Sequence, residues 1–273
     1  ICAVELTESN KYDRFNDVVN AYMACNEVYI YDDGSVTSLA NLFNDVNTTA
    51  KTKITSLGVI GGYFINNTST SEMFKNCTAL TSLDVSGWDT SKVTDMGSMF
   101  NGCSGLTSLD LSNFDTSRVT TMGNMFNKCS GLTSLDLSGW DTSRVTAMYN
   151  MFYACTALIS LDVSGWDTSR VTDMGGMFNS CSSLTSLDVS GFDTSKVAGM
   201  NGMFYNCSGL TSLDVSSFDT SKVTNMDNMF NGCSKLTTLD ISNFNISKVT
   251  NTSGMFNNCS VLKTIGMLYS NAE

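Results

Sequence analysis

Hydrophobic and polar positions repeat along most of the chain with a period of 26 residues. The segment 80–103 shows the pattern clearly and reads L-T-S-L-D-V-S-G-W-D-T-S-K-V-T-x-M-x-x-M-F-x-x-C. The leucine that opens this segment recurs without a slip, and an isoleucine takes the first position. These positions are Ile54, Leu80, Leu106, Leu132, Leu158, Leu184, Leu210, Leu236 and Leu262. A fixed period is the signature of a repeat architecture, so the sequence predicts about nine stacked rungs.

Each period contains two different hydrophobic patterns. Leu83 and Val85 alternate with polar residues, which predicts a half-buried strand. Farther along, four apolar residues fall at i, i+3, i+4 and i+7, the spacing of one face of a short helix. They are Met96, Met99, Phe100 and Cys103. The Asp-Thr-Ser run between the two patterns is typical of a turn.

One period is too short to form a core of its own, so neighbouring periods must supply the missing packing. We therefore expect an α/β solenoid, a leucine-rich-repeat-like, right-handed coil of strand, turn and short helix with 26 residues per coil. Matching side chains would form columns. We interpret the Met and aromatic columns as core rather than as a cofactor site because they recur on every rung. The large aromatic column contains Trp88, Phe114, Trp140, Trp166, Phe192, Phe218 and Phe244.

The two ends of the chain depart from the repeat. Residues 1–53 lack the full pattern, and apolar residues at helical spacing within 11–24 predict an N-terminal helical cap. Residues 54–273 are expected to form the solenoid, with a degenerate first repeat at 54–79 and a truncated last rung at 262–273. The candidates for an end-to-end interface on that rung are Leu262, Ile265 and Met267. An uncovered rung would expose apolar side chains and a strand edge, unless the natural protein continues or another chain covers it.

Composition narrows the function classes. The 273 residues include 26 acidic and 15 basic residues, and the resulting net charge of −11 disfavours nucleic acid as a partner. The chain contains no histidine, which removes Ser-His-Asp and Cys-His catalytic arrangements and imidazole metal ligands. No apolar run reaches the roughly 20 residues that a membrane-spanning helix needs. We therefore expect no membrane span, metal or cofactor.

Eight of the ten cysteines follow the same period. They are Cys77, Cys103, Cys129, Cys155, Cys181, Cys207, Cys233 and Cys259. We interpret these ladder cysteines as small buried hydrophobic residues, with bridges between adjacent rungs as the alternative. Zinc is disfavoured because the thiols lie along a line rather than in a cluster. Cys2 and Cys25 flank the expected cap helix, and a disulfide is predicted between them, although Cys25 also falls in phase with the ladder.

Charged residues also form columns. One aspartate column runs from Asp84 to Asp240, a second runs from Asp89 to Asp219, and a basic column runs from Lys92 to Lys248. Paired carboxylates are found in glycosidases, but recurrence on every rung disfavours a single catalytic site. We expect the aspartates to accept hydrogen bonds from turn amides and to pair with the basic column. A calcium array is the alternative, while an ice-binding threonine face is disfavoured by its aspartates.

Breaks in the repeat are where a specific contact surface is expected. Tyr149, Tyr153 and Tyr205 replace small or polar residues on the outward side of the expected helices. Ile159 replaces an outward threonine of the strand region. Exposed aromatic residues on a rigid scaffold are favoured contact residues, so these four are candidate contact residues, with neutral drift as the alternative.

The motif C-S-x-L-T-S-L-D-V-S-G-W-D-T-S-K-V-T-x-M-x-x-M-F resembles the BspA-like surface leucine-rich repeats, in their Trp-Asp-Thr-Ser variant, over about residues 54–267. The resemblance implies a secreted or cell-surface protein that acts in adhesion without catalysis. We therefore expect a non-enzymatic extracellular protein that recognises a protein or glycan partner. The alternative is a structural protein that polymerises head to tail into an extracellular filament through its uncapped C-terminal rung and N-terminal cap.

Overall fold

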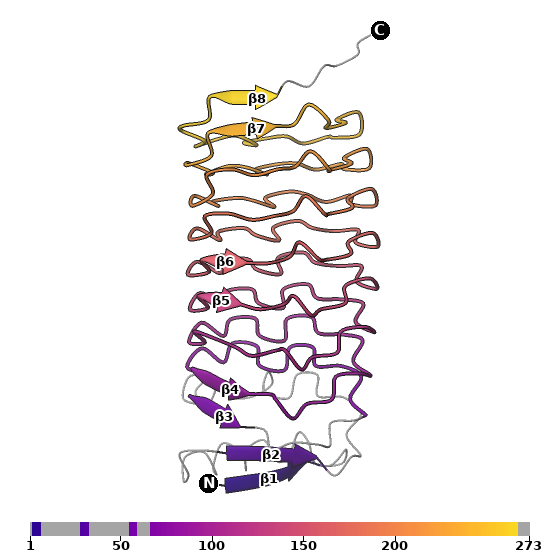
Figure 1. The fold of residues 1–273 in the computed structure, drawn as a ribbon, viewed down its shortest axis with the longest axis vertical. Helices are drawn as coiled ribbons and strands as arrows, with labels where there is room; N and C mark the ends of the chain where they lie inside the picture. Colours follow the sequence, from indigo (N-terminus) through magenta and orange to yellow (C-terminus); the bar gives the residue numbers. More distant parts are fainter. Residues whose placement is uncertain (1, 7–27, 33–54, 59–65, 267–273) are drawn as a thin grey trace.

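The computed structural model describes residues 2–6, 28–32, 55–58 and 66–266. Figure 1 shows this part of the chain as a series of coils stacked along one long axis, with the first strands at one end and the last strands at the other. The described residues contain short strands, bridges and turns, and they contain no helix. They accordingly include no helix long and apolar enough to cross a membrane.

The strands are short and pair in parallel. They are β1 (Cys2–Leu6), β2 (Val28–Asp32), β3 (Ser56–Gly58), β4 (Ser82–Asp84), β5 (Ser134–Leu135), β6 (Ser160–Leu161), β7 (Thr238–Asp240) and β8 (Thr264–Gly266). The pairing order is β1-β2-β3-β4, with β5-β6 and β7-β8 as separate pairs. In β3-β4, β5-β6 and β7-β8, each residue lies opposite the one that is a full period later in the sequence. The sequence period is therefore also the pairing distance between neighbouring coils.

A second line of parallel contacts joins the coils at the position of Asp95. Isolated bridges connect Ser69 to Asp95, Asp95 to Thr121, and so on, once in each period, as far as Asn251. Beyond each bridge, alternate backbone N–H groups donate to the next coil, as Ser98 N does to Gly123 O at 2.9 Å. The intervening N–H groups donate to the backbone oxygen three residues earlier in their own coil. This alternation gives most backbone N–H groups of the segment a hydrogen-bond acceptor without a helix.

The expectation of a short helix in each coil is wrong. The segment that contains Met96, Met99, Phe100 and Cys103 is a series of turns. The reason is a left-handed backbone at two positions of every described coil, for example at Ser98 (φ 57°) and Gly102 (φ 79°). An α-helix cannot include such residues, because each reverses the local winding of the chain. The i, i+3, i+4 spacing still places the apolar side chains inward.

The core consists of columns of identical side chains. The Phe100 column stacks from coil to coil with ring centroids 5.6–5.8 Å apart. Trp88 and Phe114, which occupy equivalent positions, lie 6.3 Å apart with nearly parallel rings. Met96, Met99 and their equivalents as far as Met229 are completely buried. Packing between like residues therefore provides the interface that a single coil lacks.

One threonine column belongs to this interior rather than to an exposed face. Thr142 and its equivalents from Thr90 to Thr220 are buried, with only 1–2% of each residue exposed. The hydroxyl of Thr142 donates to the backbone oxygen of Asp167 in the next coil at 3.0 Å, and its equivalents do the same. These buried hydroxyls therefore link neighbouring coils at the turn that follows the strand.

At the N-terminal end, parallel pairing extends into the segment expected to be a cap. The register of β1 with β2 again equals the sequence period, from Cys2 opposite Val28 to Leu6 opposite Asp32. Between β2 and β3 the offset changes, because Tyr29 lies opposite Gly58. The expected helix within 11–24 and the cysteine at 25 lie outside the described residues, and so does the predicted disulfide of Cys2 with Cys25.

At the C-terminal end, β8 pairs with β7 and continues the register of the coils before it. Leu262 packs partly against the core, while Ile265 is 37% exposed. Met267, the third residue of the predicted end-to-end interface, lies outside the described residues.

Candidate functional site

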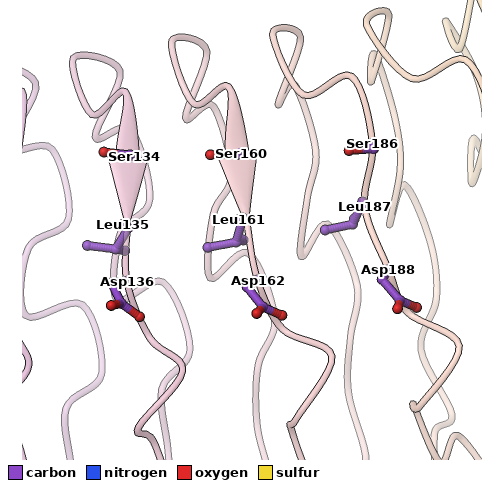
Figure 2. A pocket seen from close by; sticks show the side chains of 9 residues that line it. All are labelled: Ser134, Leu135, Asp136, Ser160, Leu161, Asp162, Ser186, Leu187 and Asp188. Carbon is purple, nitrogen blue, oxygen red and sulfur yellow. The ribbon is translucent and has the colours of Figure 1, made fainter.

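The strand segments of three successive coils form a hollow of about 460 Å³. The residues that line it, here called the Ser–Leu–Asp face, are Ser134, Leu135, Asp136, Ser160, Leu161, Asp162, Ser186, Leu187 and Asp188. Figure 2 shows that each residue type forms a row across the three coils. The site is thus the same tripeptide presented three times at the spacing of parallel strands.

The leucines form the apolar floor of this hollow, and the polar residues form its sides. Leu135, Leu161 and Leu187 are 6–7% exposed, slightly more than the leucines that open each rung. The serines and aspartates on both sides are exposed. Ile159 precedes this tripeptide in the middle coil and is 57% exposed. The hollow therefore combines a narrow apolar strip with a row of carboxylates and a row of hydroxyls.

Each aspartate of the face uses one carboxylate oxygen to accept hydrogen bonds within the turn that follows it. Its Oδ1 accepts the N–H of the serine two residues later at 3.0 Å and the hydroxyl of the same serine at 2.6–2.8 Å. These hydrogen bonds lower the pKa of Asp136, Asp162 and Asp188 below the usual 3.8. The serine N–H is the largest cause for Asp136, and the serine hydroxyl is for the other two.

The resulting face is a row of permanent negative charges. Neighbouring carboxylates repel one another and so raise the pKa of Asp162, but the serine hydrogen bonds outweigh this repulsion. The carboxylates are therefore ionised at neutral pH. Because their pKa values are lowered, none is poised as a general acid near neutral pH. The arrangement is suited to attracting cationic groups rather than to proton transfer.

The second aspartate column caps turns in the same way. Oδ1 of Asp89 accepts the N–H of Ser91 at 2.9 Å, and the equivalents as far as Asp219 repeat the bond. The prediction that both aspartate columns accept turn amides is confirmed. The predicted pairing with the basic column is not found as direct contact: between described residues, Glu72–Lys75 is the only salt bridge. Lys92 and its equivalents are exposed. Without direct contact, the charges of Lys92 and Arg144 help to lower the pKa of Asp89 and Asp141, respectively.

The ladder cysteines are buried thiols, as predicted, and the last of them is half-buried. The Sγ of Cys155 donates to the backbone oxygen of Phe126 at 3.1 Å, and six other ladder cysteines make the same contact. Burial raises the pKa of Cys155 and Cys233 to about 12. These thiols are therefore poor nucleophiles. Within the described ranges, no group of three or more His, Cys, Asp or Glu side chains is arranged to hold a metal ion.

The predicted contact residues fall into two places. Ile159 lies beside the Ser–Leu–Asp face, whereas the three tyrosines lie on the turn segments. Tyr149 is 38% exposed, while Tyr153 and Tyr205 line a separate hollow of about 480 Å³. This Tyr–Asn groove is lined by Asn150, Tyr153, Gly176, Asn179, Asn201, Gly202, Tyr205, Asp227 and Asn228. The four candidates therefore do not form one surface.

The structure adds residues that the repeat pattern alone does not single out. The serines and leucines of the Ser–Leu–Asp face belong to the consensus, so nothing in the repeat distinguishes them from other rungs. The glycines of the Tyr–Asn groove carried a usable signal, because glycine stands at equivalent positions in two successive coils, at Gly176 and Gly202. That signal becomes visible only when the left-handed positions of the repeat are aligned.

One known protein family matches most of the described residues. The family described as "Mycoplasma protein of unknown function, DUF285" matches residues 68–187 and 181–266. A comparison with curated proteins finds no match.

Proposed function

The chain belongs to this DUF285 family, and we propose that it is a non-enzymatic, BspA-like surface protein whose Ser–Leu–Asp face recognises a protein partner outside the cell. The observation that carries the proposal is the row of ionised carboxylates along an apolar strip. A partner with basic side chains at its contact surface fits this chemistry. Long-range attraction would speed the encounter, and the apolar strip would add contact area.

Two further observations support recognition rather than catalysis. The aspartates recur on every coil in the same turn geometry, whereas a catalytic site requires a unique arrangement of groups. Ile159 interrupts the column of threonines beside the face and adds an exposed apolar side chain. Exposed apolar residues beside a charged surface are typical of contact sites in protein complexes. The extracellular location rests on the resemblance of the repeat motif.

Binding to immobilised extracellular-matrix and cell-wall preparations tests this proposal. The test variant is Asp136→Asn/Asp162→Asn/Asp188→Asn, in which the amide oxygen still accepts the serine N–H. The matched control is Asp141→Asn/Asp167→Asn/Asp193→Asn, which removes the same charge from the same coils at the second aspartate column. We expect the test variant to bind at least tenfold more weakly than wild type, while the control stays within about twofold. Absence of binding to every preparation, or equal loss in both variants, would contradict the proposal.

Head-to-tail assembly is the alternative function, and strands and apolar side chains of the first and last described coils favour it. Among the described strands, β1 pairs only with β2 and β8 only with β7. Val261 and Ile265 on the last coil are 42% and 37% exposed. The coil formed by residues 236–261 also carries a hollow of about 460 Å³, lined by Ile241, Phe244, Ile246, Thr252, Gly254, Met255, Phe256 and Asn257. Heterologous contacts of this kind generate open filaments.

Sedimentation velocity over a range of protein concentrations separates this alternative from recognition of another protein. Assembly predicts species that grow with concentration, and it predicts that Ile265→Lys reduces them. A strict monomer at high concentration would exclude the filament and leave the Ser–Leu–Asp face as the functional surface.

A further inference from the structure

We propose that the Tyr–Asn groove is a binding site for a short, neutral oligosaccharide. The groove is formed by the turn segments of four successive coils, not by the strand segments of the Ser–Leu–Asp face. It therefore does not depend on the function proposed above. Three observations carry the proposal: where the repeat is interrupted, where glycine lines the hollow, and which polar groups line it.

The tyrosines interrupt a column of asparagines. In five other coils the position of Tyr153 and Tyr205 is occupied by asparagine: Asn101, Asn127, Asn179, Asn231 and Asn257. Asn179 lies on the coil between the two tyrosines, so the order across three coils is Tyr-Asn-Tyr. At the spacing of parallel strands, two coils place the tyrosine positions roughly 10 Å apart. Two aromatic side chains are thus held on one rigid surface with an amide between them.

Two neighbouring coils carry glycine in the lining of this hollow. Gly176 and Gly202 have φ values of 62° and 56°, where the coils before and after them have Asn150 and Asn228 with the same left-handed backbone. A Cβ at Gly176 would collide with the Asn150 side chain. One at Gly202 would lie 3.3 Å from Nδ2 of Asn179 and 3.7 Å from Cβ of Tyr205. Glycine at 176 therefore makes room for the Asn150 amide, and a side chain at 202 would occupy space beside Tyr205. The hollow has a volume of about 480 Å³.

The polar groups of the groove suit hydroxyl groups of a sugar. Side-chain amides such as that of Asn201 offer both donors and acceptors. Tyrosine rings offer apolar faces on which the C–H side of a sugar ring can pack. Among the described residues, the hydroxyls of Tyr153 and Tyr205 make no hydrogen bond. The lining includes one carboxylate, from Asp227, and no cation. This charge balance favours a neutral oligosaccharide over a sulfated or acidic one.

The repeat itself supplies substitutions that fit the fold. Tyr153→Asn/Tyr205→Asn restores the residue found at this position in the other coils. Gly202→Asn fills the hollow with the residue that Asn228 shows to be compatible with this backbone. Tyr149→Asn is the matched control, because Tyr149 is an exposed tyrosine of the same region that does not line the groove. Thermal unfolding verifies that every variant is folded.

Calorimetric titration of these proteins with chito-, cello-, malto- and mannotetraose, and with a heparin-derived tetrasaccharide, tests the proposal. We expect at least one neutral tetrasaccharide to bind wild type and the Tyr149→Asn variant equally. Both groove variants should lose at least tenfold in affinity for it. The proposal is overturned if no neutral tetrasaccharide binds, if only the heparin fragment binds, or if the groove variants bind like wild type.

Discussion

At the scale of single residues, each capping aspartate has two roles: it stabilises a turn and it carries an exposed negative charge. Oδ1 of each capping aspartate is used by the serine two residues later, so one part of the carboxylate stabilises the turn. The rest of the carboxylate is exposed and carries charge. Substitution by asparagine separates the two roles, because an amide oxygen still accepts the serine N–H.

Acid should destabilise the protein through these residues. Their pKa is lowered in the folded state, at Asp84, Asp89, Asp110, Asp136, Asp141, Asp162, Asp188, Asp193, Asp214, Asp219 and Asp240. Stabilisation is present above the ordinary value of 3.8 and is lost as the pH falls through the lower folded values. We expect Tm to be nearly constant between about pH 5 and 8 and to fall below about pH 4. A Tm that declines steadily from pH 7 to 5 would contradict the turn-capping role.

The ladder thiols should be unreactive while the protein is folded. Burial raises the pKa of most of them, to about 12 for Cys155 and Cys233. In a Cys2→Ser/Cys25→Ser variant at pH 8, we expect Ellman's reagent to modify the half-buried Cys259 first and the other seven only with unfolding. Rapid modification of all eight thiols in the native protein would show that the cysteine column is not core. Since the folded pKa is raised, stability should also decline as the pH rises above 9.0.

At the scale of the element, the turn segment replaces the helix that its hydrophobic spacing predicts. Spacing of i, i+3, i+4 and i+7 identifies which side chains face inward, but it does not identify the backbone that places them there. The left-handed positions exclude a helical backbone, and they carry glycine or asparagine in most coils. Aligned over eight coils, that bias was a readable signal for turns, whereas in one coil it is too weak to outweigh the hydrophobic spacing.

Ala154 tests the left-handed position directly. Its φ is 56°, a conformation that costs an L-residue with a Cβ about 1 kcal/mol or more, and Gly102 and Gly232 occupy the equivalent position in other coils. We expect Ala154→Gly to stabilise the protein by about 1 kcal/mol in chemical denaturation. The control is Ala147→Gly in the same coil, which lies in a parallel bridge at negative φ and should destabilise by about 0.5–1 kcal/mol. Destabilisation by both changes to a similar extent would contradict the assigned backbone.

At the scale of the whole molecule, the period and the inward-facing residues were readable from the sequence, because every coil repeats them. The two hollows were not. The Ser–Leu–Asp hollow depends on how parallel segments of consensus sequence lie beside one another. The Tyr–Asn groove brings together residues of four successive coils that lie full periods apart in the sequence. The pairing of β1 with β2 also went unpredicted, since neither strand carries the leucine-rich motif.

A variant that lacks one complete period should still fold into the same stack of coils. Deletion of residues 158–183 joins Ala157 to Leu184 and keeps every remaining column in phase. We expect this variant to fold with a lower Tm, because stability in stacked repeats is approximately a sum over repeats and their interfaces. Deletion of residues 158–170 removes half a period and should abolish cooperative unfolding followed by circular dichroism. Equal behaviour of the two deletions would contradict the register.

Distances between equivalent residues test most directly whether each sequence period forms one coil of the stack. Nitroxide labels are placed in pairs at the exposed positions Thr81 and Thr185, Thr81 and Thr211, or Thr81 and Thr237, which span four, five and six coils. The background is Cys2→Ser/Cys25→Ser/Cys259→Ala, because Cys259 is half-buried and would also react. Pulsed electron paramagnetic resonance should give distances that grow by about 4.8 Å with each added coil. Distances that do not rise in equal steps would contradict the stacked arrangement, and with it both proposed surfaces.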